Sequence, residues 1–480
     1  MIILLCAALS SVMFYLSQGL DNVWALAWIA PVPLLWLAYG TVPRWQLFGA
    51  SLAAFAAGQV YMAFCYGPAL IVTELAMMLG LGSLFAGTML FARWTWQRLP
   101  SWATLLAFPA LWTAIEYGIA LVSPHGSWGA LGYSQVSFPA AIQIAALFGL
   151  YVVTFVLCLF ANGLALLARG AKTAGAAGLA VCAVNIVFGV MQLAVPQGAA
   201  VRVVALADEG SAYMKAFRTG DAAAGLSVTR GYAEAIRAEA AKGAHFFVTP
   251  EGGVLGSPDV RGAVLAPLAA AARDTRSVIV TGALSQRPAR NMALAFHPDG
   301  RISEYDKRHL LLPFEGRFTP GDASGLLGQG QAVSICKDMD FPRTLRADVL
   351  GARRQDGIRI MAVPASDFMK DDWIHARMAI MRSVENRFAM VRSAFNGLET
   401  ISDAHGRVIA SARIDRPGMI VSAAMVPLGG GPTFYSRIGD VFAWLCAALS
   451  LGLALTAVGR IRASDEPQKA ARTSLRSSTS

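Results

Sequence analysis

Long apolar runs separated by short polar loops occupy most of the first 195 residues of the chain. A helix rises about 1.5 Å per residue, so roughly 20 apolar residues cross the hydrocarbon core of a membrane. Eight runs are near this length, at residues 2–20, 23–40, 46–66, 69–92, 103–122, 140–168, 173–195 and 438–458. The pattern predicts an α-helical transmembrane bundle of eight helices, seven within residues 1–196 and the last within 437–460.

The segment between the seventh and eighth runs, residues 197–436, has a different pattern. Short runs rich in β-branched and aromatic residues alternate there with longer stretches of helical periodicity. We expect strands at 201–206, 245–249, 277–281, 292–296 and 358–363, and helices at about 222–242, 258–275 and 372–388. This alternation predicts an α/β layered domain. Residues 461–480 are polar and charged, so we predict a disordered tail there.

Lys and Arg in the short loops indicate which side of the membrane each loop occupies. Alternate loops carry them, at Arg44, Arg93, Arg98, Arg169 and Lys172, while the loops between hold neither residue type. Basic loops tend to stay in the cytoplasm. We therefore expect the basic loops and the basic tail to be cytoplasmic, and residues 197–436 to lie outside the cytoplasm.

The composition agrees with a membrane protein, because 55% of the residues are hydrophobic and only 15% are charged. The mean hydropathy is +0.51. The net charge of +10 follows largely from the basic loops and tail, so it does not indicate nucleic-acid binding. The sequence has neither metal-ligand spacing nor a phosphate-binding glycine loop, so we expect no metal and no cofactor.

Cys336 is the candidate nucleophile, because it is the only cysteine within residues 197–436. It follows a strand-like run, as do Glu251 and Lys307, and loops after strands commonly carry catalytic groups. A thiol needs a base to become a thiolate, and a tetrahedral intermediate needs a cation or donor near its oxyanion. Glu251, Lys307 and Cys336 together supply these three parts.

Structural roles compete with these catalytic ones. Cys336 could be a buried structural thiol, and the two charged candidates could be ordinary surface charges. Asp338 could support the site or only pair with the neighbouring Lys337. We expect His309 to order its loop rather than to carry protons. Glu116 lies inside the fifth predicted span, where it should face the bundle interior and bind a polar group.

The Glu, Lys and Cys contexts, in this order, resemble those of the nitrilase (carbon–nitrogen hydrolase) superfamily. They are Phe247-Val248-Thr249-Pro250-Glu251, Tyr305-Asp306-Lys307-Arg308-His309 and Ser334-Ile335-Cys336. A domain of this kind inserted before the last of eight helices is similar to the apolipoprotein N-acyltransferase family. Leu131-Gly132-Tyr133-Ser134-Gln135 and Thr433-Phe434-Tyr435-Ser436-Arg437-Ile438-Gly439-Asp440 match that family as well.

The resemblance implies an α-β-β-α sandwich with a Glu251, Lys307 and Cys336 triad. Glu251 would be the general base, Lys307 the cation at the oxyanion and Cys336 the acyl-accepting nucleophile. Glu315 matches a further acidic residue of the family's active site, and Asp338 is a candidate for support. The implied enzyme is a multi-pass protein of the bacterial inner membrane, with its catalytic domain on the periplasmic side, and we favour a monomer.

The implied reaction moves an acyl chain from a phospholipid, through a thioester on Cys336, to the α-amine of a diacylglyceryl-modified apolipoprotein. One departure bears on it, because Cys336-Lys337-Asp338 stands where these acyltransferases usually have Cys-Tyr-Glu. The alternatives are a membrane-tethered amidase that uses water, an acyltransferase with a different amine acceptor, and a non-catalytic scaffold for lipoprotein handling.

Overall fold

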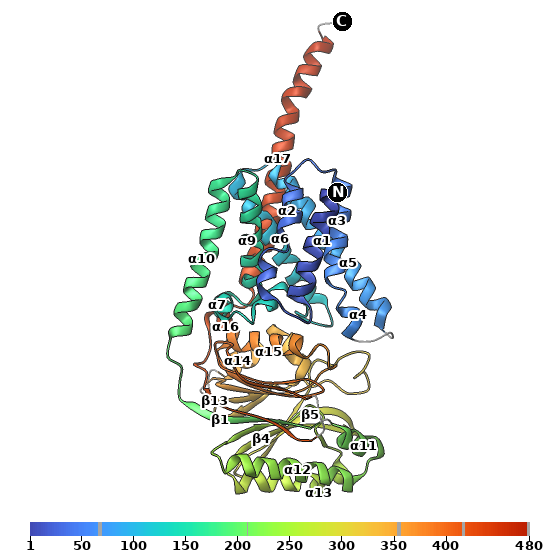
Figure 1. Cartoon of the computed structure of the whole chain (residues 1–480), viewed down its shortest axis with the longest axis vertical. Helices are drawn as coiled ribbons and strands as arrows, with labels where there is room; N and C mark the ends of the chain where they lie inside the picture. Colours follow the sequence, from blue (N-terminus) through green and yellow to red (C-terminus); the bar gives the residue numbers. More distant parts are fainter. Residues whose placement is uncertain (66–69, 209, 353–356, 415–417, 478–480) are drawn as a thin grey trace.

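The computed structural model has a helical bundle at one end and an α/β domain at the other (Figure 1). It describes residues 1–480 except 66–69, 209, 353–356, 415–417 and 478–480, with side chains described up to residue 460. The C-terminal helix points away from the α/β domain, beyond the far end of the bundle (Figure 1).

Within the described residues, six helices are long and apolar enough to cross a membrane. They are α3 with α4 (Arg44–Cys65), α5 (Ile71–Trp96), α6 (Ser101–Val122), α9 (Leu150–Ala168), α10 (Lys172–Ala194) and the first part of α17 (Val441–Arg460). Two shorter apolar segments, α1 (Ile2–Gln18) and η1 with α2 (Trp24–Ala38), pack in the same bundle. Apolar helices thus occur at all eight predicted positions, and six of them have the length of a span.

Two regions differ from the prediction. The run at 140–168 is divided into α7 (Pro139–Ile142), α8 (Ala145–Phe148) and α9, because Gly149 adopts a φ of +79°. Glycine suits this position, since a Cβ there would meet the Tyr435 ring at 2.5 Å. In addition, α17 (Val441–Ser477) continues through most of the tail for which we predicted disorder.

Two sheets form the centre of the α/β domain. One has the order β13-β1-β2-β4-β5-β6, with β3 paired to β4, and the other has the order β12-β11-β10-β9-β8-β7. The strands are β1 (Ala200–Ala207), β2 (Phe246–Val248), β3 (Val254–Leu255), β4 (Val278–Gln286), β5 (Ala289–Phe296), β6 (Ile302–Asp306), β7 (Leu326–Gly328), β8 (Gln331–Val333), β9 (Ile360–Ser366), β10 (Ala389–Phe395), β11 (Leu398–Ser402), β12 (Val408–Arg413) and β13 (Ile420–Pro427). The predicted α/β domain is therefore confirmed.

Helices cover the outer faces of both sheets, so the layers run helix, sheet, sheet, helix. The outermost layer holds α12 (Ala222–Ala240) and α13 (Pro258–Asp274), with α11 (Ser211–Thr219) beside them (Figure 1). The layer next to the bundle holds α14 (Pro342–Gly351) and α15 (Asp372–Asn386) (Figure 1). Between the sheets, side chains such as Val203, Val280 and Val391 form a closed apolar core, because alternate strand residues face opposite sides of a sheet.

The α15 helix joins the α/β domain to the bundle. Its apolar residues Met378 and Ile380 belong to the same core cluster as residues of the membrane helices. The Arg382 Nη2 donates a hydrogen bond to the Tyr133 hydroxyl at 2.8 Å, in the η3 turn (Leu131–Gln135). The Leu150 N–H donates to Glu385 Oε1 at 2.7 Å. These buried contacts hold the second sheet, and the loops at its edge, against the membrane helices.

Candidate active site

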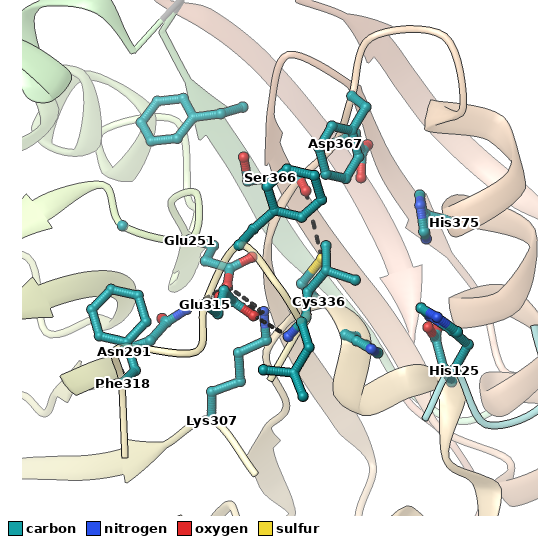
Figure 2. Close-up of a pocket in the computed structure, with 18 of the residues that line it drawn as sticks. His125, Glu251, Asn291, Lys307, Glu315, Phe318, Cys336, Ser366, Asp367 and His375 are labelled. Carbon is teal, nitrogen blue, oxygen red and sulfur yellow. Dashed lines mark hydrogen bonds and ion pairs between the residues drawn. The ribbon is translucent and has the colours of Figure 1, made fainter. Parts of the chain in front are cut away.

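Glu251, Lys307 and Cys336 follow three different strands, and the fold brings their side chains together (Figure 2). Glu251 lies three residues after β2, Lys307 directly after β6, and Cys336 three residues after β8, at the start of the short η4 helix (Cys336–Asp340). Two of these strands belong to the first sheet and β8 belongs to the second. The site therefore exists only where the two sheets face each other.

The Lys307 ammonium lies between two carboxylates. Its Nζ donates to Glu251 Oε1 at 2.7 Å and to the two Glu315 oxygens at 2.9 and 2.8 Å. Only 2% of the Lys307 side chain is exposed. Asn291 braces the two acids, because its Nδ2 is 2.7 Å from Glu251 Oε1 and 2.6 Å from Glu315 Oε1. The network fixes both carboxylates and the ammonium relative to one another.

Cys336 has an unusual backbone conformation for a residue with a side chain, because its φ is +41°. Such strain is retained where the surroundings over-determine it, often at functional sites. The thiol is partly buried, and its Sγ lies 3.6 Å from the Ser366 carbonyl oxygen. Its backbone position at the start of η4 presents the sulfur to the pocket that Glu251 and Lys307 line (Figure 2).

Burial and neighbouring charges set the protonation of these groups. Burial raises the pKa of the Cys336 thiol well above its usual value, and the Glu251 carboxylate raises it further, while Lys307 opposes both effects. Burial also raises the pKa of Glu251, against the opposing charge of Lys307. Burial alone would lower the pKa of Lys307, but Glu251, Cys336 and Glu315 together raise it. The arrangement therefore holds a protonated thiol near a basic carboxylate and a permanent cation.

Asp338 does not pair with Lys337, which was one of the two roles that we considered for it. Its carboxylate accepts hydrogen bonds from the His309 N–H at 2.8 Å, the Tyr305 hydroxyl at 2.7 Å and the Ile335 N–H at 3.1 Å. These donors come from the end of β6, from the loop after it that carries Lys307, and from the turn that carries Cys336. Asp338 thus ties the two loops together from behind the pocket.

His309 and Lys337 have neighbours that explain their positions. The His309 Nδ1 lies 2.9 Å from Asp338 Oδ1, and its ring stacks on Phe341 with centroids 3.7 Å apart. It orders its loop, as we expected. Lys337 is buried and donates only a 3.3 Å hydrogen bond to the Leu310 carbonyl within the described residues. Burial lowers the pKa of this second lysine.

Glu251, Lys307, Glu315 and Cys336 line a cavity of about 390 Å³, and Asp338 is not part of its lining. The wall opposite the triad includes residues of the membrane helices α4 and α5, such as Met62 and Met77, and the loop residue Trp128. Leu312 and Phe314, which are 57% and 49% exposed, contribute apolar surface near Glu315. One side of the cavity, its floor, is therefore polar and charged and holds Glu251, Lys307 and Cys336, while its other walls are mainly apolar and include residues of the bundle. No group of His, Cys, Asp and Glu able to hold a metal ion occurs among the residues described.

Sequence reasoning missed Asn291, which contacts both carboxylates. The sequence gives little indication of a functional role for Asn291, because a single asparagine just before the apolar run Met292–Phe296 is common at the start of a strand. Only the antiparallel pairing of β5 with β6, which sets Met292 opposite Asp306, brings Asn291 beside Lys307. The Lys307 N–H in fact donates to the Asn291 carbonyl at 2.9 Å.

Comparisons with known proteins cover both parts of the chain. The family model described as the apolipoprotein N-acyltransferase N-terminal domain matches residues 10–163, and the carbon–nitrogen hydrolase model matches residues 201–425. An apolipoprotein N-acyltransferase of Geobacter metallireducens is 29% identical, over 92% of this chain and 93% of its own length. One of Vibrio vulnificus is 25% identical, over 90% and 92%. An amidase structure from Nesterenkonia sp. is 20% identical with a TM-score of 0.40, over 52% of this chain and 97% of its own.

The layered domain, the match at residues 201–425 and the apolar helices define the class as a membrane-embedded carbon–nitrogen hydrolase. Within this class, the N-terminal match and the nearly full-length relatives are more specific. The chain belongs to the apolipoprotein N-acyltransferase family.

Proposed function

We propose that the protein transfers an acyl chain from a phospholipid to the α-amine of a diacylglyceryl-modified apolipoprotein, through a thioester on Cys336. The observation that carries this proposal is the cavity that joins the Cys336 thiol to apolar residues of α4 and α5. Both substrates are anchored in the membrane, so a site that opens toward the bundle can receive them. A hydrolase of small soluble amides would not need this connection.

In the first half-reaction, Glu251 accepts the Cys336 proton as the sulfur attacks the ester carbonyl of the phospholipid. The raised pKa of Glu251 suits this transfer, because it brings the base closer in proton affinity to the thiol. The tetrahedral oxyanion forms near the Lys307 ammonium, which remains charged throughout. When the intermediate collapses, Glu251 returns the proton to the leaving alcohol, so a lysophospholipid departs and a thioester remains.

In the second half-reaction, the acceptor's neutral α-amine attacks the thioester carbonyl. Glu251 accepts the proton that the amine loses, the carbon–sulfur bond breaks, and the thiolate regains a proton. One oxyanion site serves both steps, because each step passes through a tetrahedral intermediate on the same carbonyl carbon. Glu315 and Asn291 position Lys307 and Glu251 through the contacts given above.

We also propose that the protein spans the bacterial inner membrane with its α/β domain on the periplasmic side. The distribution of basic side chains supports this orientation. Arg93 donates to the Val42 carbonyl, and Arg460 Nη1 donates to the Arg98 carbonyl at 3.0 Å. These contacts cluster the basic loops at the end of the bundle away from the α/β domain (Figure 1). Basic loops stay in the cytoplasm, so the domain lies on the other side.

The proposal is tested by incubating the detergent-solubilised full chain with a phospholipid of defined acyl chains and measuring its intact mass. We expect a mass increase equal to one acyl group, located on the Cys336 peptide and absent from Cys336→Ala. Adding a diacylglyceryl-cysteine peptide should remove the adduct and acylate the peptide. Ammonia release from simple amides without any adduct would instead support the amidase alternative and contradict the proposal.

A further inference from the structure

Two glutamates in the membrane helices, Glu74 and Glu116, are both buried, and within the described part of the chain only one of them has hydrogen-bond partners. Glu116 of α6 is 8% exposed, and it accepts hydrogen bonds from the Leu131 N–H at 2.9 Å and the Thr154 hydroxyl at 2.7 Å. It faces the bundle interior, as the sequence predicted. Glu74 of α5 is 4% exposed, and neither of its carboxylate oxygens has a hydrogen-bond partner among the residues that the structure describes.

The position of Glu74 connects it to the candidate active site. It lies in the first turn of α5 and lines the same cavity as Cys336. Its neighbours in the cavity wall include Met62, Leu70 and Met77, which cannot hydrogen-bond a carboxylate. The carboxylate thus stands in a mainly apolar wall, at the membrane-facing side of a cavity whose floor holds the nucleophile.

Four basic side chains that line the cavity contact other groups. Lys307 binds Glu251 and Glu315, and His375 Nε2 lies 2.9 Å from Asp371 Oδ2. Lys337 donates to the Leu310 carbonyl, and Arg317 lies over the Phe217 and Phe318 rings. Among the described residues, Glu74 takes part in none of the ion pairs.

Burying a carboxylate without a hydrogen-bond or ion-pair partner costs free energy, because the group loses its hydration and no protein interaction replaces it. Such a group is retained in a binding cavity when a ligand supplies the missing donor. A donor that carries both positive charge and N–H groups offsets this cost most fully, because it adds ion pairing to the hydrogen bond. A primary ammonium has both properties.

We propose that Glu74 binds a primary ammonium group of a substrate as it enters the Cys336 cavity. The inference rests on the proposed acyl transfer, in which two substrates can present this group. One is the acceptor, through its α-amine before deprotonation, and the other is a phospholipid donor with an ethanolamine headgroup. Glu74 is in either case a substrate-positioning residue, distinct from the Glu251 base.

The test compares wild type with Glu74→Gln in the two half-reactions. In the first arm, the rate of Cys336 acylation is measured with phosphatidylethanolamine and with phosphatidylglycerol of the same acyl chains. In the second arm, protein already acylated on Cys336 receives a diacylglyceryl-cysteine peptide, and kcat and KM are measured. Loss of a charge-assisted bond should cost roughly tenfold or more. A loss confined to phosphatidylethanolamine identifies the headgroup, and a raised acceptor KM identifies the α-amine.

Glu116→Gln is the matched control, because it changes a buried glutamate of a membrane helix that already has protein donors. It should leave both the donor preference and the acceptor KM unchanged. Without substrate, Glu74→Gln should have a melting temperature equal to or above that of wild type, because the substitution removes an unpaired buried charge. Functional sites often lower the stability of the free protein in this way. That result also excludes misfolding as the cause of a kinetic loss.

Two negative results are distinguishable. If wild type forms no acyl adduct on Cys336, the proposed function fails before Glu74 is tested. If wild type carries out both half-reactions and Glu74→Gln matches it in donor preference and in acceptor KM, the assignment of Glu74 is overturned while the acyl transfer stands.

Discussion

The membrane bundle and the α/β domain differ in the partners that their buried charged side chains have. In the α/β domain, many buried charges form ion pairs, such as Arg392 with Asp367 at 2.5 Å and Arg308 with Asp348 at 2.5 Å, although Glu399 forms none among the described residues. In the bundle, Glu116 accepts hydrogen bonds from two neutral groups, the Leu131 N–H and the Thr154 hydroxyl, and Glu74 has no hydrogen-bond partner among the described residues. An unpartnered charge in a membrane helix, such as Glu74, therefore carries more information about function than one charge of an ion pair, because no described group nearby offsets its cost.

The largest expected effect comes from the nucleophile, because no other group in the paired network of the α/β domain can form the thioester. Cys336→Ser should reduce acyl transfer by more than roughly a thousandfold, since a serine hydroxyl is far less acidic than a thiol at the same base. The measurement is the rate of peptide acylation. The melting temperature should stay near that of wild type, and substantial remaining activity would show that the acyl group travels by another route.

The second largest effect tests whether Glu251, and not a neighbouring group, is the general base. Glu251→Gln should slow Cys336 acylation by roughly 10² to 10⁴-fold, which is the usual contribution of a general base. In wild type the rate should fall as pH drops through the raised pKa of Glu251, because the protonated acid cannot accept the thiol proton. This acidic limb should be absent from the pH profile of Glu251→Gln, and a limb that persists would assign it to another group.

A third prediction concerns Asp338, which ties two loops of the α/β domain together. Asp338→Asn keeps the shape but replaces a carboxylate that accepts several buried hydrogen bonds, and 1% of Asp338 is exposed. We expect a loss of about 2–4 kcal/mol in unfolding free energy. Chemical denaturation monitored by the tryptophan fluorescence of the purified chain would measure it. Asp274→Asn, at an exposed ion pair, should cost almost nothing.

The smallest effect tests the joint between the two regions. Tyr133→Phe removes the hydroxyl that accepts from Arg382 at 2.8 Å, and should cost about 1 kcal/mol in stability. Tyr213→Phe is the matched control, because the Tyr213 hydroxyl is buried without a hydrogen-bond partner among the described residues. Its loss should be neutral or stabilising. Equal melting temperatures for the two variants would indicate that the Arg382 contact contributes little.

Much of the fold was predictable from local pattern. The five strands expected at 201–206, 245–249, 277–281, 292–296 and 358–363 correspond to β1, β2, β4, β5 and β9. These strands are buried on both faces, so they read as continuous apolar runs. The strand β12 was missed, because its residues alternate between exposed and half-buried and carry arginine and serine. Its strand state depends on pairing with β11 rather than on its composition.

The candidate site also contains some residues that the sequence indicated and others that it did not. Cys336, Glu251 and Lys307 stood out because each follows a strand-like run in a recognisable context, and their side chains line one cavity in the structure. Asn291 and Glu74 did not stand out, because an amide at a strand end and an acid at a helix start are common in any protein. Their importance depends on what surrounds them after folding.

Local sequence by itself determined the apolar helices, the α/β class of the inserted domain and the candidates for the reactive side chains, because hydrophobic period and residue chemistry are local properties. Only the tertiary structure decided that the triad meets between two sheets, that Asp338 binds the Lys307 loop instead of Lys337, and that Glu74 faces the cavity without a partner. Hydrogen bonding and burial depend on residues distant in sequence, so the environment that gives each group its role exists only once the two sheets and the bundle have packed together.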